Sequence, residues 1–253
     1  MRNNIFYGAV ALALLFAGCT SHYQLTDVSQ TRILVDNRYD ATPDVAAAAF
    51  LAPFKQKVDS VMGPVVGRAA CDMVADRPES ALSNLLPDIF MYMAKYYQEK
   101  PDFAVYNMGG IRAALSKGDV TYGDVLDIAP FENKICFITL SGEQVMHLFE
   151  QIAFRGGEGV SKGVQLVITK DGHLVSARLN GQPIDPKASY RITTIDYLVQ
   201  GNDGLTAFKE GTNLNSPSDS KNNARYVISD YFREMMEAGK AVDAKVEGRI
   251  IVK

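Results

Sequence analysis

The sequence is poor in the residues from which most metal and nucleophilic sites are built. Its 253 residues include only three histidines and three cysteines. The histidines, His22, His147 and His173, are widely separated, and no Cys-x-x-Cys pair or Cys/His metal spacing is present. A Gly-x-Ser-x-Gly turn and an acidic cluster suited to magnesium are missing as well. The sequence therefore predicts no catalytic residue, no metal site and no cofactor in this chain.

An excess of positive charge and internal repeats are also lacking. The formal net charge is −3, which gives no reason to expect a nucleic acid as partner. Hydrophobic residues make up 47% of the chain and charged residues 22%, which is ordinary for a globular protein with a full core. No tract of low complexity interrupts the sequence.

The N-terminal apolar run, Ile5 to Phe16, is too short for an ordinary transmembrane helix. It follows the positive Arg2 and leads into Leu15-Phe16-Ala17-Gly18-Cys19, which is typical of a bacterial lipobox. We expect residues 1–19 to be a lipoprotein signal, with Cys19 as the lipidated residue. The protein would be exported and anchored to the outer membrane or the periplasmic face, since two acyl chains suffice for stable anchoring. The alternative is a plain cleaved secretory signal.

Two cysteines remain beyond the signal, Cys71 and Cys136. A disulfide between them is one alternative, because exported proteins can form disulfides. Cys136 lies inside an apolar run typical of a strand, where a thiol behaves as a small core residue. We therefore expect two buried thiols.

The remaining chain is predicted to fold as a mixed α+β domain with layered helices and sheet. Residues 20–62 form an N-terminal extension, with a short strand at Arg32 to Val35 and a helix that starts at Thr42-Pro43-Asp44 and ends near Met62. Residues 63–253 form the main domain. Its predicted helices are 80–98, 141–154 and 224–238, its predicted strands include 65–71, 103–106, 134–140, 164–169, 174–179, 190–195 and 248–252, and 155–159 is predicted to be a flexible loop.

The stretch from Phe103 to Leu140 holds most of the residues capable of selective chemistry. A short apolar strand ends at Asn107-Met108-Gly109-Gly110-Ile111-Arg112. Consecutive glycines let a ligand approach the backbone, and the arginine after them carries a planar fork of donors. Further on, Pro130-Phe131-Glu132-Asn133 presents a ring and an amide from a loop between two regular elements.

Three separated blocks resemble the C-terminal, substrate-binding domain of bacterial and animal 5′-nucleotidases. They are Asn107 to Arg112, Pro130 to Asn133, and Tyr197 with Asp203 in a glycine-rich turn. A fourth block, Arg77 to Leu85, is similar to the family's entry helix, so the resemblance extends from about Gly67 to Ile250. It implies the fold of that domain, mixed α/β.

By this resemblance the base of a nucleoside or nucleotide would lie between the rings of Phe131 and Tyr197. Asp203 would accept hydrogen bonds from ribose hydroxyls. The full set of expected ligand-binding residues is Asn107, Gly109, Gly110, Arg112, Phe131, Asn133, Tyr197 and Asp203, with Arg77 and Asn84 as weaker candidates. Taken singly, Phe131 and Tyr197 also suit a core, and Asp203 suits its own turn.

Complete 5′-nucleotidases use a two-metal centre in an N-terminal domain, and the resemblance does not extend to its motifs. We therefore expect a nucleotide-recognition subunit whose metal-bearing phosphoesterase domain is a separate chain, the only place where divalent metals are expected. Whether the chain is itself an enzyme stays open. Two alternatives remain: a nucleoside-binding surface module without catalysis, and a degenerate scaffold for protein contacts. The base and the partner are not identified by the sequence.

Overall fold

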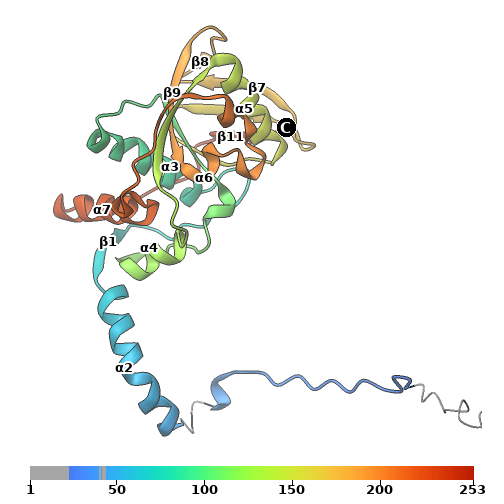
Figure 1. Cartoon of the computed structure of the whole chain (residues 1–253), viewed down its shortest axis with the longest axis vertical. Helices are drawn as coiled ribbons and strands as arrows, with labels where there is room; N and C mark the ends of the chain where they lie inside the picture. The colour runs from blue at the N-terminus through green and yellow to red at the C-terminus, as the bar shows by residue number, and fades with distance from the viewer. Residues whose placement is uncertain (1–22, 40, 42–43) are drawn as a thin grey trace, which may run out of the picture. The chain divides into compact units, whose positions relative to one another are not determined.

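The computed structural model describes residues 23–39, 41 and 44–253 (Figure 1). The predicted signal with Cys19, together with Thr42 and Pro43 of the predicted helix start, lies outside the described residues. The chain divides into two units, residues 1–50 and 51–253. The predicted domain boundary at residue 62 stays a prediction.

The first unit contains little regular structure among its described residues. The predicted strand at Arg32 to Val35 is wrong, because these residues are exposed and no strand in the described part of the chain pairs with their backbone. A short 3₁₀ helix, η1 (Asn37–Tyr39), follows. Helix α2 (Val45–Met62) confirms the predicted helix, and the Asp44 carboxylate caps it by accepting from the N–H groups of Ala46 and Ala47. No described helix is long and apolar enough to span a bilayer.

The second unit contains three sheets with helices packed against them, which confirms the mixed α/β class. Its strands are β1 (Val65–Ala69), β2 (Phe103–Tyr106), β3 (Gly118–Thr121), β4 (Ile135–Ser141), β5 (Gly159–Val160), β6 (Val164–Ile168), β7 (Leu174–Leu179), β8 (Gln182–Pro183), β9 (Ser189–Ile195), β10 (Thr212–Asn215) and β11 (Ile250–Val252). Its α-helices are α3 (Ala81–Met93), α4 (Tyr122–Ile128), α5 (Gly142–Phe154), α6 (Asp196–Val199) and α7 (Ala224–Glu237). The 3₁₀ helices are η2 (Ala94–Tyr97), η3 (Met108–Gly110), η4 (Asn202–Gly204), η5 (Thr206–Glu210) and η6 (Ser220–Asn222).

The central sheet has the order β10-β4-β9-β2-β5. Strand β2 is buried along its whole length and pairs in parallel with β9 and antiparallel with β5. Helix α3 packs against β2, β5 and β9. Helix α5 contacts both β4 and β7, and so lies between the central sheet and the sheet that contains β7. Continuous burial explains why β2 reads as an unbroken apolar run.

Two smaller sheets complete the domain. One has the order β11-β6-β7-β8 and the other pairs β1 with β3. In Figure 1, α4 and α7 lie beside β1 at one end of the domain, and β7 and β8 lie toward the opposite end. The candidate site is formed by loops at the strand ends of the central sheet.

Three helices begin with capping boxes, those after Ser80, Thr121 and Ser141. The side chain of each cap residue accepts from the backbone N–H three residues on, and its own backbone N–H donates to the side chain of that residue. Helix α3 converts to the 3₁₀ helix η2 at Ala94, so the single helix predicted over 80–98 is two elements.

The expectation for the two cysteines holds in part. Cys71 and Cys136 are both free thiols, so the disulfide alternative is wrong. Cys136 is buried in β4, and burial raises the pKa of its thiol. Cys71 is only partly buried. Its Sγ lies 3.2 Å from the Asp243 carboxylate, and this contact raises the pKa of its thiol.

Candidate functional site

One cavity of about 340 Å³ gathers the residues that the sequence analysis singled out. A cavity of this size is at the lower end of small-molecule sites. Its lining consists of Asn107, Gly109, Gly110, Arg112, Phe131, Asn133, Tyr197 and Asp203. Three segments that are distant in sequence therefore meet at one place on the domain.

The first wall is the turn after β2. The two glycines of this turn do different work, although both have ordinary negative φ values. A Cβ on Gly110 would come within 2.6 Å of Asn107 Oδ1, so only glycine fits there. A Cβ on Gly109 would meet nothing closer than Asp203 Oδ2 at 3.8 Å. Gly110 is therefore needed for close packing, and Gly109 leaves the backbone open to the cavity.

Asn107 connects this turn to the third segment. Its side chain is buried, and its Nδ2 donates to Asp203 Oδ2 at 2.6 Å. Its Oδ1 has no hydrogen-bond partner among the described residues. A buried acceptor without a partner costs free energy. The bond from Nδ2 to the Asp203 carboxylate is the contact that accounts for the position of this amide.

Arg112 follows the turn, and its guanidinium is exposed. Its backbone N–H donates to the Ile128 carbonyl at 3.0 Å, which fixes the main chain. Within the described residues the guanidinium makes one hydrogen bond, from Nη1 to the Gly109 carbonyl at 3.3 Å. The other donors of this always-charged group remain available for an anion.

The second wall is the loop between α4 and β4. The Phe131 ring is 46% exposed, which is high for a phenylalanine beside a folded core. Asn133 is partly buried, and its carbonyl accepts from the Ala224 N–H at 2.7 Å. The loop therefore presents its ring outward while its backbone is tied down.

The third segment carries Tyr197 in α6 and Asp203 in η4. Asp203 adopts a left-handed backbone conformation with φ of 55°. Its Oδ1 accepts from the Tyr197 hydroxyl at 3.3 Å and lies 3.9 Å from Arg155 Nη2. Partial burial, followed by the charge and hydrogen bond of Asp203, raises the pKa of Tyr197 above its ordinary value. The hydroxyl therefore stays protonated at neutral pH and can donate to the carboxylate.

The two ring-bearing segments share one anchor, the Asp196 carboxylate. Its Oδ1 accepts from the backbone N–H of Lys134 at 3.0 Å and from that of Tyr197 at 2.8 Å. The backbone N–H of Asp196 in turn donates to the Lys134 carbonyl at 2.9 Å. A single side chain thus links the loop of Phe131 to the start of α6.

The model of the family described as 5′-nucleotidase, C-terminal domain, matches residues 65–210, more than half of the chain. The chain belongs to this family. The match includes every residue that lines the cavity, and it confirms the resemblance carried by the three sequence blocks.

Relatives and solved structures agree with this family. The chain is 24% identical over 204 residues to a 5′-nucleotidase of Vibrio cholerae, covering 79% of this chain and 35% of the relative. It is 29% identical over 246 residues to the trifunctional nucleotide phosphoesterase protein YfkN of Bacillus subtilis, covering 89% of this chain and 16% of the relative. The crystal structure of a 5′-nucleotidase precursor from Thermus thermophilus superposes with a TM-score of 0.70 at 28% identity, covering 84% of this chain and 44% of that one. The chain thus spans less than half the length of each.

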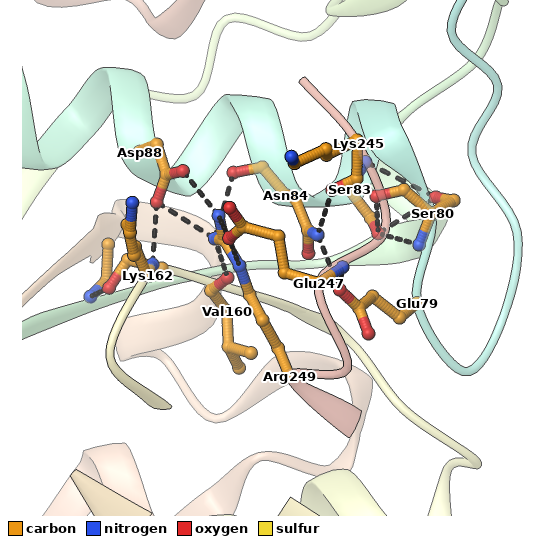
Figure 2. A network of polar contacts seen from close by, with 12 residues as sticks. Glu79, Ser80, Ser83, Asn84, Asp88, Val160, Lys162, Lys245, Glu247 and Arg249 are labelled. Carbon is orange, nitrogen blue, oxygen red and sulfur yellow. Dashed lines mark hydrogen bonds and ion pairs between the residues drawn. The ribbon is translucent and has the colours of Figure 1, made fainter. Parts of the chain in front are cut away.

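The weaker candidates, Arg77 and Asn84, do not line the cavity of this 5′-nucleotidase C-terminal domain. Asn84 is buried on α3, where its Nδ2 donates to Glu79 Oε1 at 2.6 Å and to the Lys245 carbonyl at 3.0 Å. Figure 2 shows it inside a polar cluster between α3 and the C-terminal segment. These contacts assign Asn84 to the attachment of that segment, away from the cavity.

Arg77 lies one contact away from the cavity. Its Nη2 donates to Glu158 Oε1 at 2.6 Å, and Arg155 binds the same oxygen. The other oxygen of Glu158 accepts from the backbone N–H of Met108, in the turn after β2. Arg77 therefore acts on the turn through a fully buried carboxylate, which the sequence analysis did not single out.

The prediction of a flexible loop over residues 155–159 is wrong. Glu158 is 1% exposed and Gly159 already belongs to β5. Gly157 has φ of 111°, and a Cβ there would lie 2.4 Å from the Pro78 carbonyl oxygen. Glycine is required here because the chain is tightly packed. A glycine-rich composition is equally typical of a flexible loop, so the sequence alone could not distinguish the two.

Neither of the two described histidines lies at the cavity. His147 is exposed on α5 and His173 follows a turn, where its ring lies 3.2 Å from Asp171. Among residues 23–39, 41 and 44–253, no group of three or more His, Cys, Asp or Glu side chains could hold a metal ion. The absence of cofactors and metals from this chain stays a prediction.

Proposed function

We propose that this domain binds a nucleoside or nucleotide in the cavity, with the base between the rings of Phe131 and Tyr197. The observation that carries the proposal is the pairing of two exposed rings with a carboxylate and an arginine around one cavity, in a family of 5′-nucleotidase domains. Flat heterocycles are bound by ring faces, and each stacking contact contributes about 1 to 3 kcal/mol.

The polar groups of the cavity suit the remainder of a nucleotide. Asp203 accepts from the ribose hydroxyls, because its carboxylate is already oriented by Asn107 and Tyr197. Asn133 reads the edge of the base, and Arg112 meets an anionic group such as a phosphate, since its guanidinium is exposed beside Gly109.

Calorimetric titration with adenosine tests the binding site. Wild-type protein should bind, while Phe131→Ala and Tyr197→Ala should each weaken binding by about 1 to 3 kcal/mol. Tyr96→Ala is the matched control, because Tyr96 is 60% exposed and lies outside the cavity lining. If adenosine, uridine and their monophosphates all fail to bind to the wild-type protein, the proposed site is wrong.

We propose further that the two-metal phosphoesterase centre is contributed by a separate polypeptide and that this chain supplies nucleotide recognition. Three histidines without metal spacing in the whole sequence support this division. Purified protein with AMP or UDP-glucose and added divalent metal should release no phosphate. Hydrolysis by the purified chain alone contradicts the division between two polypeptides.

A place at a membrane surface completes the proposal. Export and lipid attachment at Cys19 rest on the lipobox pattern in the sequence. Cys19→Ala should move the protein from the membrane fraction to the soluble fraction. An unchanged distribution counts against the anchor.

A further inference from the structure

The guanidinium of Arg225 holds the segment on both sides of Phe131. Arg225 lies in the first turn of α7, and its side chain is only 11% exposed. Its Nη1 donates to the Pro130 carbonyl at 3.0 Å, and its Nη2 donates to Glu132 Oε1 at 3.0 Å. We propose that Arg225 is a positioning residue that sets the Phe131 ring for stacking on a base, an inference that rests on the proposed function.

The start of α7 reinforces this attachment through its backbone. The Ala224 N–H donates to the Asn133 carbonyl at 2.7 Å, and Asn223 forms an antiparallel bridge with Lys134. The loop therefore contacts α7 before and after Phe131. Because the ring itself is 46% exposed, its position depends on its backbone more than on its packing.

Arg225 occupies its place at a cost to stability. Its Nε is buried without a hydrogen-bond partner among the described residues, and its carboxylate partner Glu132 is 81% exposed. A buried guanidinium with an unsatisfied donor is often less stabilising than an apolar side chain of the same volume. The guanidinium carbon also lies 5.7 Å from the centre of the Tyr226 ring. Neither that contact nor a role in stability requires two bonds to groups that flank Phe131, whereas a positioning role accounts for both bonds.

Lysine cannot reproduce this arrangement. The two donors of Arg225 reach a carbonyl on one side of Phe131 and a carboxylate on the other. A planar fork bonds two acceptors at once, whereas an ammonium on a flexible stem is a single point charge. Arg225 also lies outside the part of the chain that the family model matches, residues 65–210. The C-terminal part of the chain thus contributes contacts to the loop of Phe131 although the family model does not include it.

The test compares adenosine affinity in five proteins by NMR titration, so that weak binding remains measurable: wild type, Arg225→Met, Arg233→Met, Phe131→Ala and the double variant of Phe131→Ala with Arg225→Met. Arg225→Met should raise Kd about tenfold, within the range of one lost stacking contact. Arg233→Met, which removes an exposed ion pair with Asp230 on the same helix, should leave Kd unchanged. In a Phe131→Ala background, Arg225→Met should add less than about a twofold change, because the ring to be positioned is gone.

A second measurement does not require a ligand. Amide hydrogen exchange over residues 131–134 should be faster in Arg225→Met and in Arg225→Lys, with exchange in α3 and α5 unchanged. Equal losses of affinity with and without Phe131, or unchanged affinity and exchange, overturn the positioning role. If wild-type protein binds no nucleoside, the proposed function fails, and unchanged exchange in the variant then removes the loop attachment as well.

Discussion

The cavity and the polar cluster around Arg249 are built from the same kinds of side chain but have different roles. We define the Arg249 cluster as Glu79, Asn84, Asp88, Glu247 and Arg249, all labelled in Figure 2. Arg249 is 5% exposed, and its Nη2 contacts Asp88 at 2.6 Å and Glu247 at 2.8 Å. Arg112 of the cavity is exposed and bonds to one backbone carbonyl among the described residues.

The difference between them lies in which molecule satisfies the polar groups. In the cluster the partners come from the protein: Asn84 Nδ2 bonds to Glu79 and to the Lys245 carbonyl, and Arg249 Nη1 bonds to the Val160 carbonyl at 2.8 Å. In the cavity, donors and ring faces are left open. Polar groups that are bonded within the protein stabilise one fold, whereas polar groups without a protein partner are available to bind a ligand.

The largest expected effect is the loss of stability in Arg249→Met. Removing the buried cation leaves the carboxylates of Asp88 and Glu247, which are 33% and 29% exposed, without their partner, which costs about 3 kcal/mol of unfolding free energy, the lower end for a buried ion pair. Adenosine affinity per folded molecule should change little, because Arg249 does not line the cavity. Urea unfolding measures the first quantity and calorimetry the second.

Arg68→Met is the control for this prediction. Arg68 pairs with Asp119, and both side chains are more than half exposed, so its removal should cost under about 1 kcal/mol. Comparable losses from Arg68 and Arg249 would contradict the assignment of the cluster to stability.

A smaller effect separates two buried asparagines. Asn84→Ala and Asn107→Ala each remove one donor from a carboxylate, Glu79 and Asp203 respectively, at a cost of about 1 to 3 kcal/mol in stability. Only Asn107→Ala should also weaken adenosine binding, because Asp203 loses the amide that orients it. The two variants serve as controls for each other, and equal affinities in both would remove the distinction between cavity and cluster.

The resemblance to the motifs of a known family predicted the lining of the cavity. The residues by themselves indicated only local geometry, a glycine pair after a strand and a ring presented after a proline. The same reasoning ranked Asn84 below Asn107 but still kept it as a candidate for the ligand site, because the partners that hold Asn84, Glu79 and the Lys245 carbonyl, are visible only in the structure. The sequence analysis did not identify Asp196, Glu158 or Arg225 as residues of the site. Each of them bonds to a backbone group of a segment distant in sequence, at Lys134, Met108 and Pro130 respectively, and a sequence carries no local signal for such bonds.

The smallest expected effect concerns pH. The hydrogen bond from Arg249 is the main cause that lowers the pKa of Glu247 from 4.5. A lowered pKa in the folded state means that this stabilisation is complete above pH 4.5 and is lost as the pH falls through the folded value. The pKa of Tyr197 in the cavity is shifted in the opposite direction. Because this pKa is raised, the hydrogen bond to Asp203 is fully present up to the ordinary value of 10.0 and is lost only as the pH rises through the folded value.

Acid should therefore weaken the cluster before it affects the hydroxyl contact in the cavity. We expect the difference in Tm between wild type and Glu247→Gln to be constant from pH 7 to about pH 5 and to shrink below pH 4.5, where the wild-type carboxylate also becomes neutral. Glu237→Gln on α7 provides a control that should give no such pattern. A Tm difference that is flat down to pH 3 means that the charge of Glu247 contributes nothing to the cluster, and the contrast with the cavity then rests on Asp88 and Arg249 alone.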